Sequence, residues 1–156
     1  MKEKLWLFIV KFILVSAPLF LLWRWKGEDW YLVLVNHLYS YIFARILGLN
    51  ILFFAPPVAV FLSLLAFISL MIIATGMSVR AKVLRLLAGL MIMVFWHVIL
   101  VEAVYLLHEG PGVPSPAFAR LSGPLYILTG ALPFVLWILL AQEQVAGLFQ
   151  RRGEKT

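Results

Sequence analysis

The chain has 156 residues, of which 64% are hydrophobic and only 13% are charged, too few to cover the surface of a water-soluble domain. It contains no cysteine, which excludes disulfides, thiolate catalysis and cysteine-ligated metals. The formal net charge is +6, but the basic residues stand in short clusters at the ends of apolar runs. Such clusters indicate anionic lipid head groups, and not nucleic acid, as their partner.

Long apolar runs predict the fold class. A bilayer core of about 30 Å needs about 20 apolar helical residues to cross it. Four runs approach this length: 5–23, 57–76, 83–107 and 124–142. We therefore expect an all-α protein, with residues 1–156 forming a single integral membrane domain. Its core is predicted to be a bundle of four transmembrane helices embedded in the lipid bilayer.

The first run begins close to the N-terminus but does not have the pattern of a secretory signal. Lys11 interrupts its apolar core, and Pro18 directly follows the small residues that a signal peptidase needs. We therefore expect an uncleaved helix, with Lys11 reaching back to the membrane surface. Four aromatic residues close to its far end are expected to anchor the membrane–water interface: Trp23, Trp25, Trp30 and Tyr31.

The segment 30–48 carries a polar stripe. Its polar residues recur at helical spacing: Asn36, His37, Ser40, Tyr41 and Arg45. This period predicts an amphipathic helix in the outer head-group region. On the polar face of this helix, His37, Tyr41 and Arg45 are candidate contacts for an anionic lipid head group or a peptide carboxylate. The alternative is a further span with its stripe facing other helices, which would place the N-terminal lysines outside, against the positive-inside rule.

Turn residues and caps delimit the later helices. Pro57 is expected in the first turn of the second span. Gly76 opens a short basic turn, after which Ser78 is the expected N-cap of the third helix. Residues 108–116 are rich in turn formers and are predicted to be irregular. Ser122 is the expected N-cap of the fourth helix.

The basic residues predict the orientation of the chain. They gather at the N-terminal end, in the turn between the second and third runs, and in the tail 143–156: Lys2, Lys4 and Lys11; Arg80, Lys82 and Arg85; Arg151, Arg152 and Lys155. Lys and Arg are enriched on the cytoplasmic side of membrane proteins. We therefore expect both termini to be cytoplasmic, in the cell membrane.

The third run holds two polar residues that are costly in hydrocarbon. His97 lies near its middle, and Glu102 follows five residues later. Because a charge at this depth costs at least ~2.5 kcal/mol, Glu102 is expected to face protein, to be protonated or to have a partner. Five residues turn a helix by about 140°, so the two should not share a face or form a metal site by themselves. We expect them to make intramembrane polar contacts between helices, with a proton relay as the alternative.

From Ala44 onward the pattern resembles the exosortase/archaeosortase superfamily of membrane transpeptidases. The resembling stretches are Ala-Arg-Ile-Leu-Gly-Leu at 44–49, the proline-led span 57–76, the basic turn and helix at 79–90, and Trp-His-Val-Ile-Leu at 96–100. The resemblance implies a helical membrane protein connected with protein sorting.

The chain departs from that family where its chemistry lies. The family's cysteine would fall near Ala59, and its asparagine and arginine would fall at His97 and Leu100. Arg120 is the nearest candidate for the basic residue of the last helix. Covalent transpeptidation needs the missing nucleophile, so the resemblance implies a catalytically silent relative.

The predicted function is therefore that of a non-catalytic accessory protein of an exosortase-type sorting system. It would need no cofactor and would pack against a membrane-protein partner such as a sortase-like enzyme. Two alternatives stay open. One is a small structural subunit of an energy-converting membrane complex, and the other is a small transporter or enzyme that uses His97 and Glu102.

Overall fold

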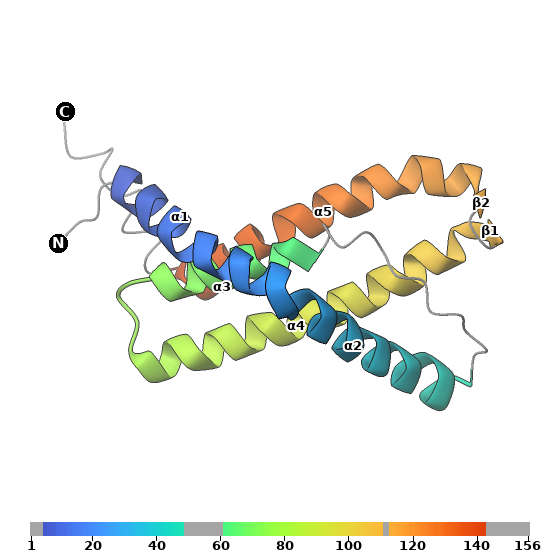
Figure 1. Ribbon diagram of the computed structural model, residues 1–156, viewed down its shortest axis with the longest axis horizontal. Coiled ribbons are helices and arrows are strands. Elements are labelled where there is room, and N and C mark those ends of the chain that lie inside the picture. The colour runs from blue at the N-terminus through green and yellow to red at the C-terminus, as the bar shows by residue number, and fades with distance from the viewer. Residues whose placement is uncertain (1–4, 49–60, 111–112, 143–156) are drawn as a thin grey trace.

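The computed structural model describes residues 5–48, 61–110 and 113–142. Its elements, in chain order, are α1 (Leu5–Leu22), the π-helix η1 (Trp23–Gly27), α2 (Glu28–Tyr39), the π-helix η2 (Ser40–Ile46), α3 (Leu62–Ile73), α4 (Val79–Leu106), β1 (His108–Gly110), β2 (Val113–Pro114) and α5 (Pro116–Leu140). The protein is all-α, as predicted (Figure 1). The two short strands form an antiparallel ribbon between α4 and α5, in the segment that we predicted to be irregular.

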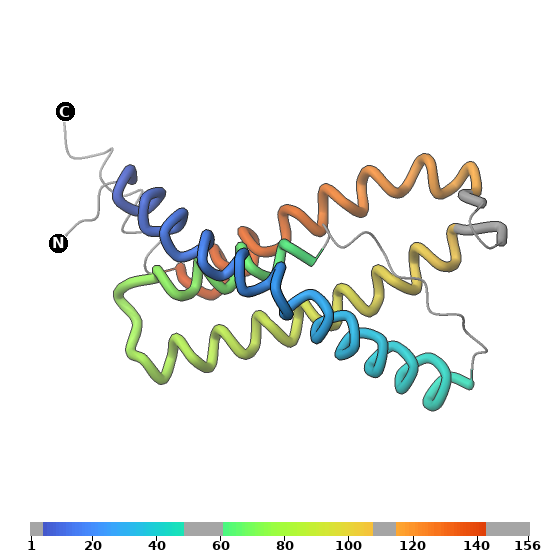
Figure 2. Tube along the Cα trace, viewed as in Figure 1, coloured from blue at the N-terminus to red at the C-terminus, as the bar shows by residue number. Residues whose placement is uncertain are grey.

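The first helix runs without interruption from Leu5 to Ile46, a stretch of 42 residues (Figure 2). At 1.5 Å per residue, it is about 63 Å long, roughly twice the thickness of a bilayer core. We predicted two separate helices, 5–23 and 30–48, and the break between them is wrong. The predicted amphipathic helix is the second half of one long helix, and it lies against α4.

The residues between the two predicted helices continue the helix instead of ending it. Gly27 has helical torsion angles, with φ −63° and ψ −37°. Arg24 and Glu28, one turn apart, form an ion pair of 2.7 Å across the junction. A pair with this spacing stabilises a helix. The helix therefore continues from α1 into α2 through this charged helical turn.

Helix α3 forms the core of the bundle and contacts α1, α4 and α5. Seven of its residues are buried, and they fill the space between the longer helices: Leu64, Leu65, Phe67, Ser69, Leu70, Met71 and Ile73. The chain then turns through Gly76, whose φ of +84° is favourable only for glycine. We call this side of the molecule, at residues 74–78, the basic-turn end, and the opposite side, at β1 and β2, the hairpin end.

Gly89 lets α3 and α4 approach closely. A Cβ atom at this position would lie 2.0 Å from Cζ of Phe67, which is inside any real contact distance. Phe67 itself is fully buried in the core. The ring therefore occupies the space that a side chain at Gly89 would need.

Serine side chains cap α4 and α5. Ser78 accepts a hydrogen bond from the backbone N–H of Ala81, which confirms the predicted cap. Our prediction that Ser122 caps the last helix is wrong. This helix begins earlier, at Pro116, and Ser115 caps it by accepting from the N–H of Phe118. A serine followed by proline at the first helical position satisfies the same rules better than Ser122 does.

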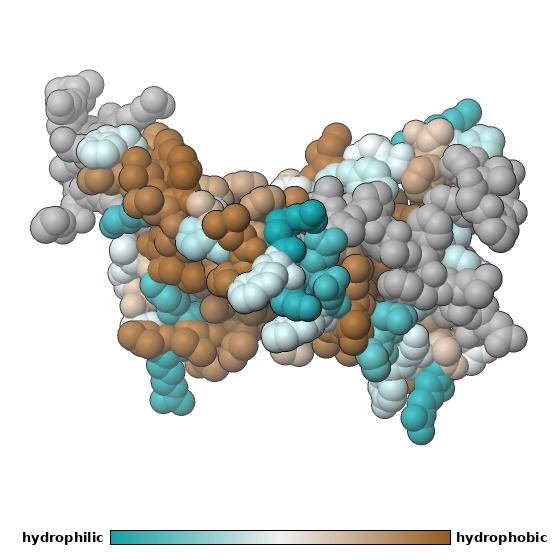
Figure 3. All heavy atoms as spheres, viewed as in Figure 1, coloured by the Kyte–Doolittle hydropathy of each residue, from teal (hydrophilic) through white to brown (hydrophobic). Residues whose placement is uncertain are grey.

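Within the described part of the chain, three helices are long and apolar enough to cross a membrane: Leu5–Ile46, Val79–Leu106 and Pro116–Leu140. The described part of the predicted second span is α3, whose 12 residues measure about 18 Å. Residues 57–60 of that span and the tail 143–156 lie outside the described residues. Figure 3 shows hydrophobic side chains over much of one face, with hydrophilic ones gathered over the junction of α1 and α2.

Candidate functional site

A polar cluster of Tyr31, Ser63 and His97 lies inside the bundle and joins α2, α3 and α4. The hydroxyl of Tyr31 lies 2.6 Å from Nδ1 of His97, and the hydroxyl of Ser63 lies 3.1 Å from Nε2. His97 is completely buried, and Tyr31 is nearly so. Each helix contributes one residue, so the cluster connects three helices by two hydrogen bonds.

The cluster leaves no polar atom of the imidazole unsatisfied. A neutral histidine donates from one ring nitrogen and accepts at the other, whereas a hydroxyl can do either. The two hydroxyls therefore satisfy His97 in both tautomers. Aromatic rings surround it: Tyr31 and Phe61 both meet the imidazole edge-on, with ring centroids 5.8 and 5.1 Å away. This buried, fully bonded histidine has the environment of an interhelical link.

Glu102 has a separate partner on the same neighbouring helix. The Tyr39 hydroxyl donates to Oε2 of Glu102 at 2.8 Å, and Tyr39 is 1% exposed. The expectation that this carboxyl has a partner is therefore met within the protein. Tyr31 bonds to His97, and the later Tyr39 bonds to the later Glu102. Helix α2 therefore runs parallel to the second half of α4.

The prediction that His97 and Glu102 do not share a face agrees with the structure, because each bonds to a separate tyrosine of α2. Tyr31 and Tyr39 are eight positions apart, so their side chains are rotated by about 80° relative to each other around α2. Each tyrosine therefore reaches a different flank of α4. The two polar residues are tied to one helix through separate hydroxyls.

Sequence reasoning missed the tyrosines of this site. Tyr31 was predicted to be an interfacial anchor together with three tryptophans, yet Tyr31 and Trp23 are buried. Trp25 and Trp30 are 75% and 74% exposed, as an anchor requires. The signal that was available is the spacing of four between Tyr31, Val35 and Tyr39, which are all buried.

The stripe His37, Tyr41 and Arg45 stays exposed on α2 and η2. Nδ1 of His37 lies 2.8 Å from the carbonyl oxygen of Val33, one turn earlier on its own helix. Tyr41 is 56% exposed. The stripe therefore lies on the outside of the bundle, apart from the cluster around His97.

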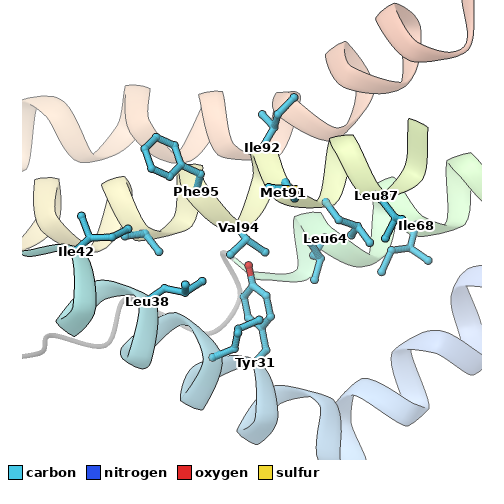
Figure 4. A pocket seen from close by; sticks show the side chains of 13 residues that line it. Tyr31, Leu38, Ile42, Leu64, Ile68, Leu87, Met91, Ile92, Val94 and Phe95 are labelled. Carbon is cyan, nitrogen blue, oxygen red and sulfur yellow. The ribbon is translucent and has the colours of Figure 1, made fainter. Parts of the chain in front are cut away.

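An apolar groove of about 740 Å³ lies between α2, α3 and α4 (Figure 4). Apart from Tyr31, its lining side chains are aliphatic, aromatic or methionine, and they include Leu38, Ile42, Leu64, Met91 and Phe95. The volume is in the range of sites that hold a small ligand or the side chains of a docked segment. The hydroxyl of Tyr31 is bonded to His97, so the groove presents hydrocarbon to its occupant.

Basic side chains at the basic-turn end bond to the last carbonyls of two helices. Lys82 Nζ donates to the carbonyl of Ile72 at 3.0 Å, near the end of α3. Arg85 Nη1 donates to the carbonyl of Leu140 at 2.8 Å, at the end of α5. Cations are favourable at helix C-termini because carbonyls there lack helical partners. These residues therefore hold the turn together, in addition to their predicted effect on topology.

Within the described residues, no group of three or more His, Cys, Asp or Glu side chains comes close enough to hold a metal ion. Comparisons with protein-family models, curated proteins and solved structures return no match. The resemblance to exosortases therefore stays a prediction from the sequence.

Proposed function

We propose that this protein is a non-catalytic membrane accessory that seats a hydrophobic segment of a membrane partner in the groove between α2, α3 and α4. The observation that carries the proposal is the groove itself. It is open on one side, formed by three helices and lined almost wholly by apolar side chains. A helix or extended segment that is itself apolar would bury its side chains there by close packing.

The internal polar residues support a scaffold more than a reaction centre. His97 and Glu102 each bond to a tyrosine of α2, and these contacts hold the groove-forming helices together. A transporter or enzyme that used both residues would need them on one path. They bond instead to separate hydroxyls that lie eight residues apart on α2.

The sequence pattern supplies the class of partner. The resemblance to exosortases without their nucleophile suggests that the occupant is a sortase-like enzyme, or the hydrophobic sorting helix of its substrate. Both termini would be cytoplasmic in the cell membrane. The position of Leu5 and of the end of α5 at the basic-turn end supports this orientation, because both helices meet there through Phe8 and Trp137.

Photocrosslinking in the native membrane tests the proposal. Met91 in the groove and Ile127 on α5 are matched positions, because they are 75% and 74% exposed. A photoreactive benzoyl-phenylalanine at Met91 is expected to capture a membrane protein, with a sortase-like enzyme or its substrate among the products. The same residue at Ile127 should capture lipid. Equal protein capture at both positions, or lipid alone at Met91, would contradict the proposal.

A further inference from the structure

A second cavity, at the basic-turn end, combines two ammonium groups with apolar walls. It has a volume of about 430 Å³ and lies between α1, the end of α3 and the start of α4. Lys11 and Lys82 line it, together with the hydroxyl residue Thr75. The two lysines are 71 positions apart in the sequence, so the fold brings them to one site.

The charges of this cavity favour an anion. Among the described residues, its lining contains two cationic side chains and no acidic one. Lys82 donates to the carbonyl of Ile72, which fixes the position of its ammonium group beside the cavity. An ammonium has three N–H donors, so this hydrogen bond uses one of them.

The walls below the ammonium groups are apolar. Leu14 and Val15 of α1 line the cavity together with Ile72 and Ile73 of α3. A free inorganic phosphate gains nothing from contact with apolar walls, whereas the first carbons of an acyl chain can pack against them. Basic pockets between membrane helices are typical sites for acidic lipid head groups.

We propose that the Lys11–Lys82 cavity binds the phosphate of an anionic phospholipid, with the upper part of an acyl chain against Leu14 and Ile72. The lipid would join α1 to the turn between α3 and α4. This site is distinct from the groove, shares no lining residue with it, and does not depend on the proposed partner.

Lipid retention measures the proposed site directly. The purified protein is exchanged into detergent with phosphatidylglycerol or phosphatidylcholine, and the bound lipid is counted by native mass spectrometry. Lys11→Gln and Lys82→Gln are each expected to weaken retention of phosphatidylglycerol about fivefold, the effect of one basic contact to an acidic membrane lipid. Lys82→Arg keeps a cation and a donor, so it should retain the lipid.

Arg80→Gln is the matched control, because Arg80 is an exposed cation of the same turn that does not line the cavity. Equal losses in Arg80→Gln and Lys82→Gln would overturn the proposal in favour of general surface charge. Unchanged retention in Lys11→Gln would overturn it as well, since Lys11 lines the cavity and is exposed. Displacement of the lipid by millimolar inorganic phosphate would assign the cavity to free phosphate instead. A circular dichroism spectrum and a melting curve for each variant identify any loss caused by unfolding.

Discussion

Adding one methyl group at Gly89 is expected to separate the two helices that meet there. The new Cβ would lie 2.0 Å from Cζ and 2.5 Å from Cε1 of Phe67. Ordinary contact begins near 3.4 Å, so the ring or its helix must move by about 1.4 Å, the difference from 2.0 Å. Phe67 is 0% exposed, and the surrounding core opposes that movement. Overpacking of this kind costs about 1–3 kcal/mol of unfolding free energy.

A double-mutant cycle tests the cause of this loss. Phe67→Leu alone should cost a part of the ~3–5 kcal/mol that complete truncation of a buried ring costs. In the double variant, the methyl at residue 89 fills space that the ring has left. The double variant should therefore be more stable than the sum of the single changes, by about 1 kcal/mol or more. Unfolding by sodium dodecyl sulfate, followed by circular dichroism in mixed micelles, measures all four proteins.

Gly130→Ala is the control for the helix itself, because a Cβ at this position on α5 meets nothing within 4 Å. Its unfolding free energy should stay the same or rise by up to about 1 kcal/mol, because alanine favours a helix more than glycine does. The reasoning about the close contact is refuted if Gly89→Ala behaves like Gly130→Ala. It is also refuted if the effects at residues 67 and 89 simply add.

Three further substitutions test the polar links between helices. Tyr31→Phe removes the hydroxyl bonded to His97 and should cost about 0.6–1.7 kcal/mol in the same unfolding assay; no change would show that the bond contributes nothing. Arg85→Lys keeps the charge of the basic turn. The lysine side chain, however, cannot easily reach the carbonyl of Leu140 and contact the turn before α4 at the same time. The substitution should lower the melting temperature by a few degrees while leaving the orientation of the termini unchanged, and a reversed orientation in a tag-accessibility assay would contradict this. Thr129→Val removes the acceptor that the indole N–H of Trp96 uses at 3.0 Å, and should cost about 0.6–1.7 kcal/mol by the same titration. Full stability of this variant would show that the indole does not depend on the threonine.

The sequence alone predicted the helical fold class and identified the polar residues that need partners. Apolar runs of bilayer length and the serine before the basic turn follow local rules, so they predict α4 and its cap well. The requirement that Glu102, within an apolar helix, must have a partner is equally local, because the cost of an isolated charge in hydrocarbon does not depend on the fold.

Local sequence rules could not predict that the first helix is continuous, nor which residues bond to His97 and Glu102. We predicted that the first span ends at residue 23, whereas the pair of Arg24 with Glu28 continues the helix. Tyr31 is a typical interfacial anchor by composition, and only the packing of α2 on α4 brings its hydroxyl to His97. The groove likewise depends on three segments that are far apart in the chain.

The charged turn within the long helix has a consequence for the surrounding lipid. The Arg24 side chain is 60% exposed, and seven residues later Tyr31 already touches His97, well inside α4. Acyl chains on this flank therefore meet ionic groups at a depth where α4 still offers hydrocarbon. We expect the head groups to bend inward to hydrate them, so the bilayer should be thinner on this flank than on the opposite one. A bilayer that is thinner on one side of the protein would favour shorter or more disordered lipids there.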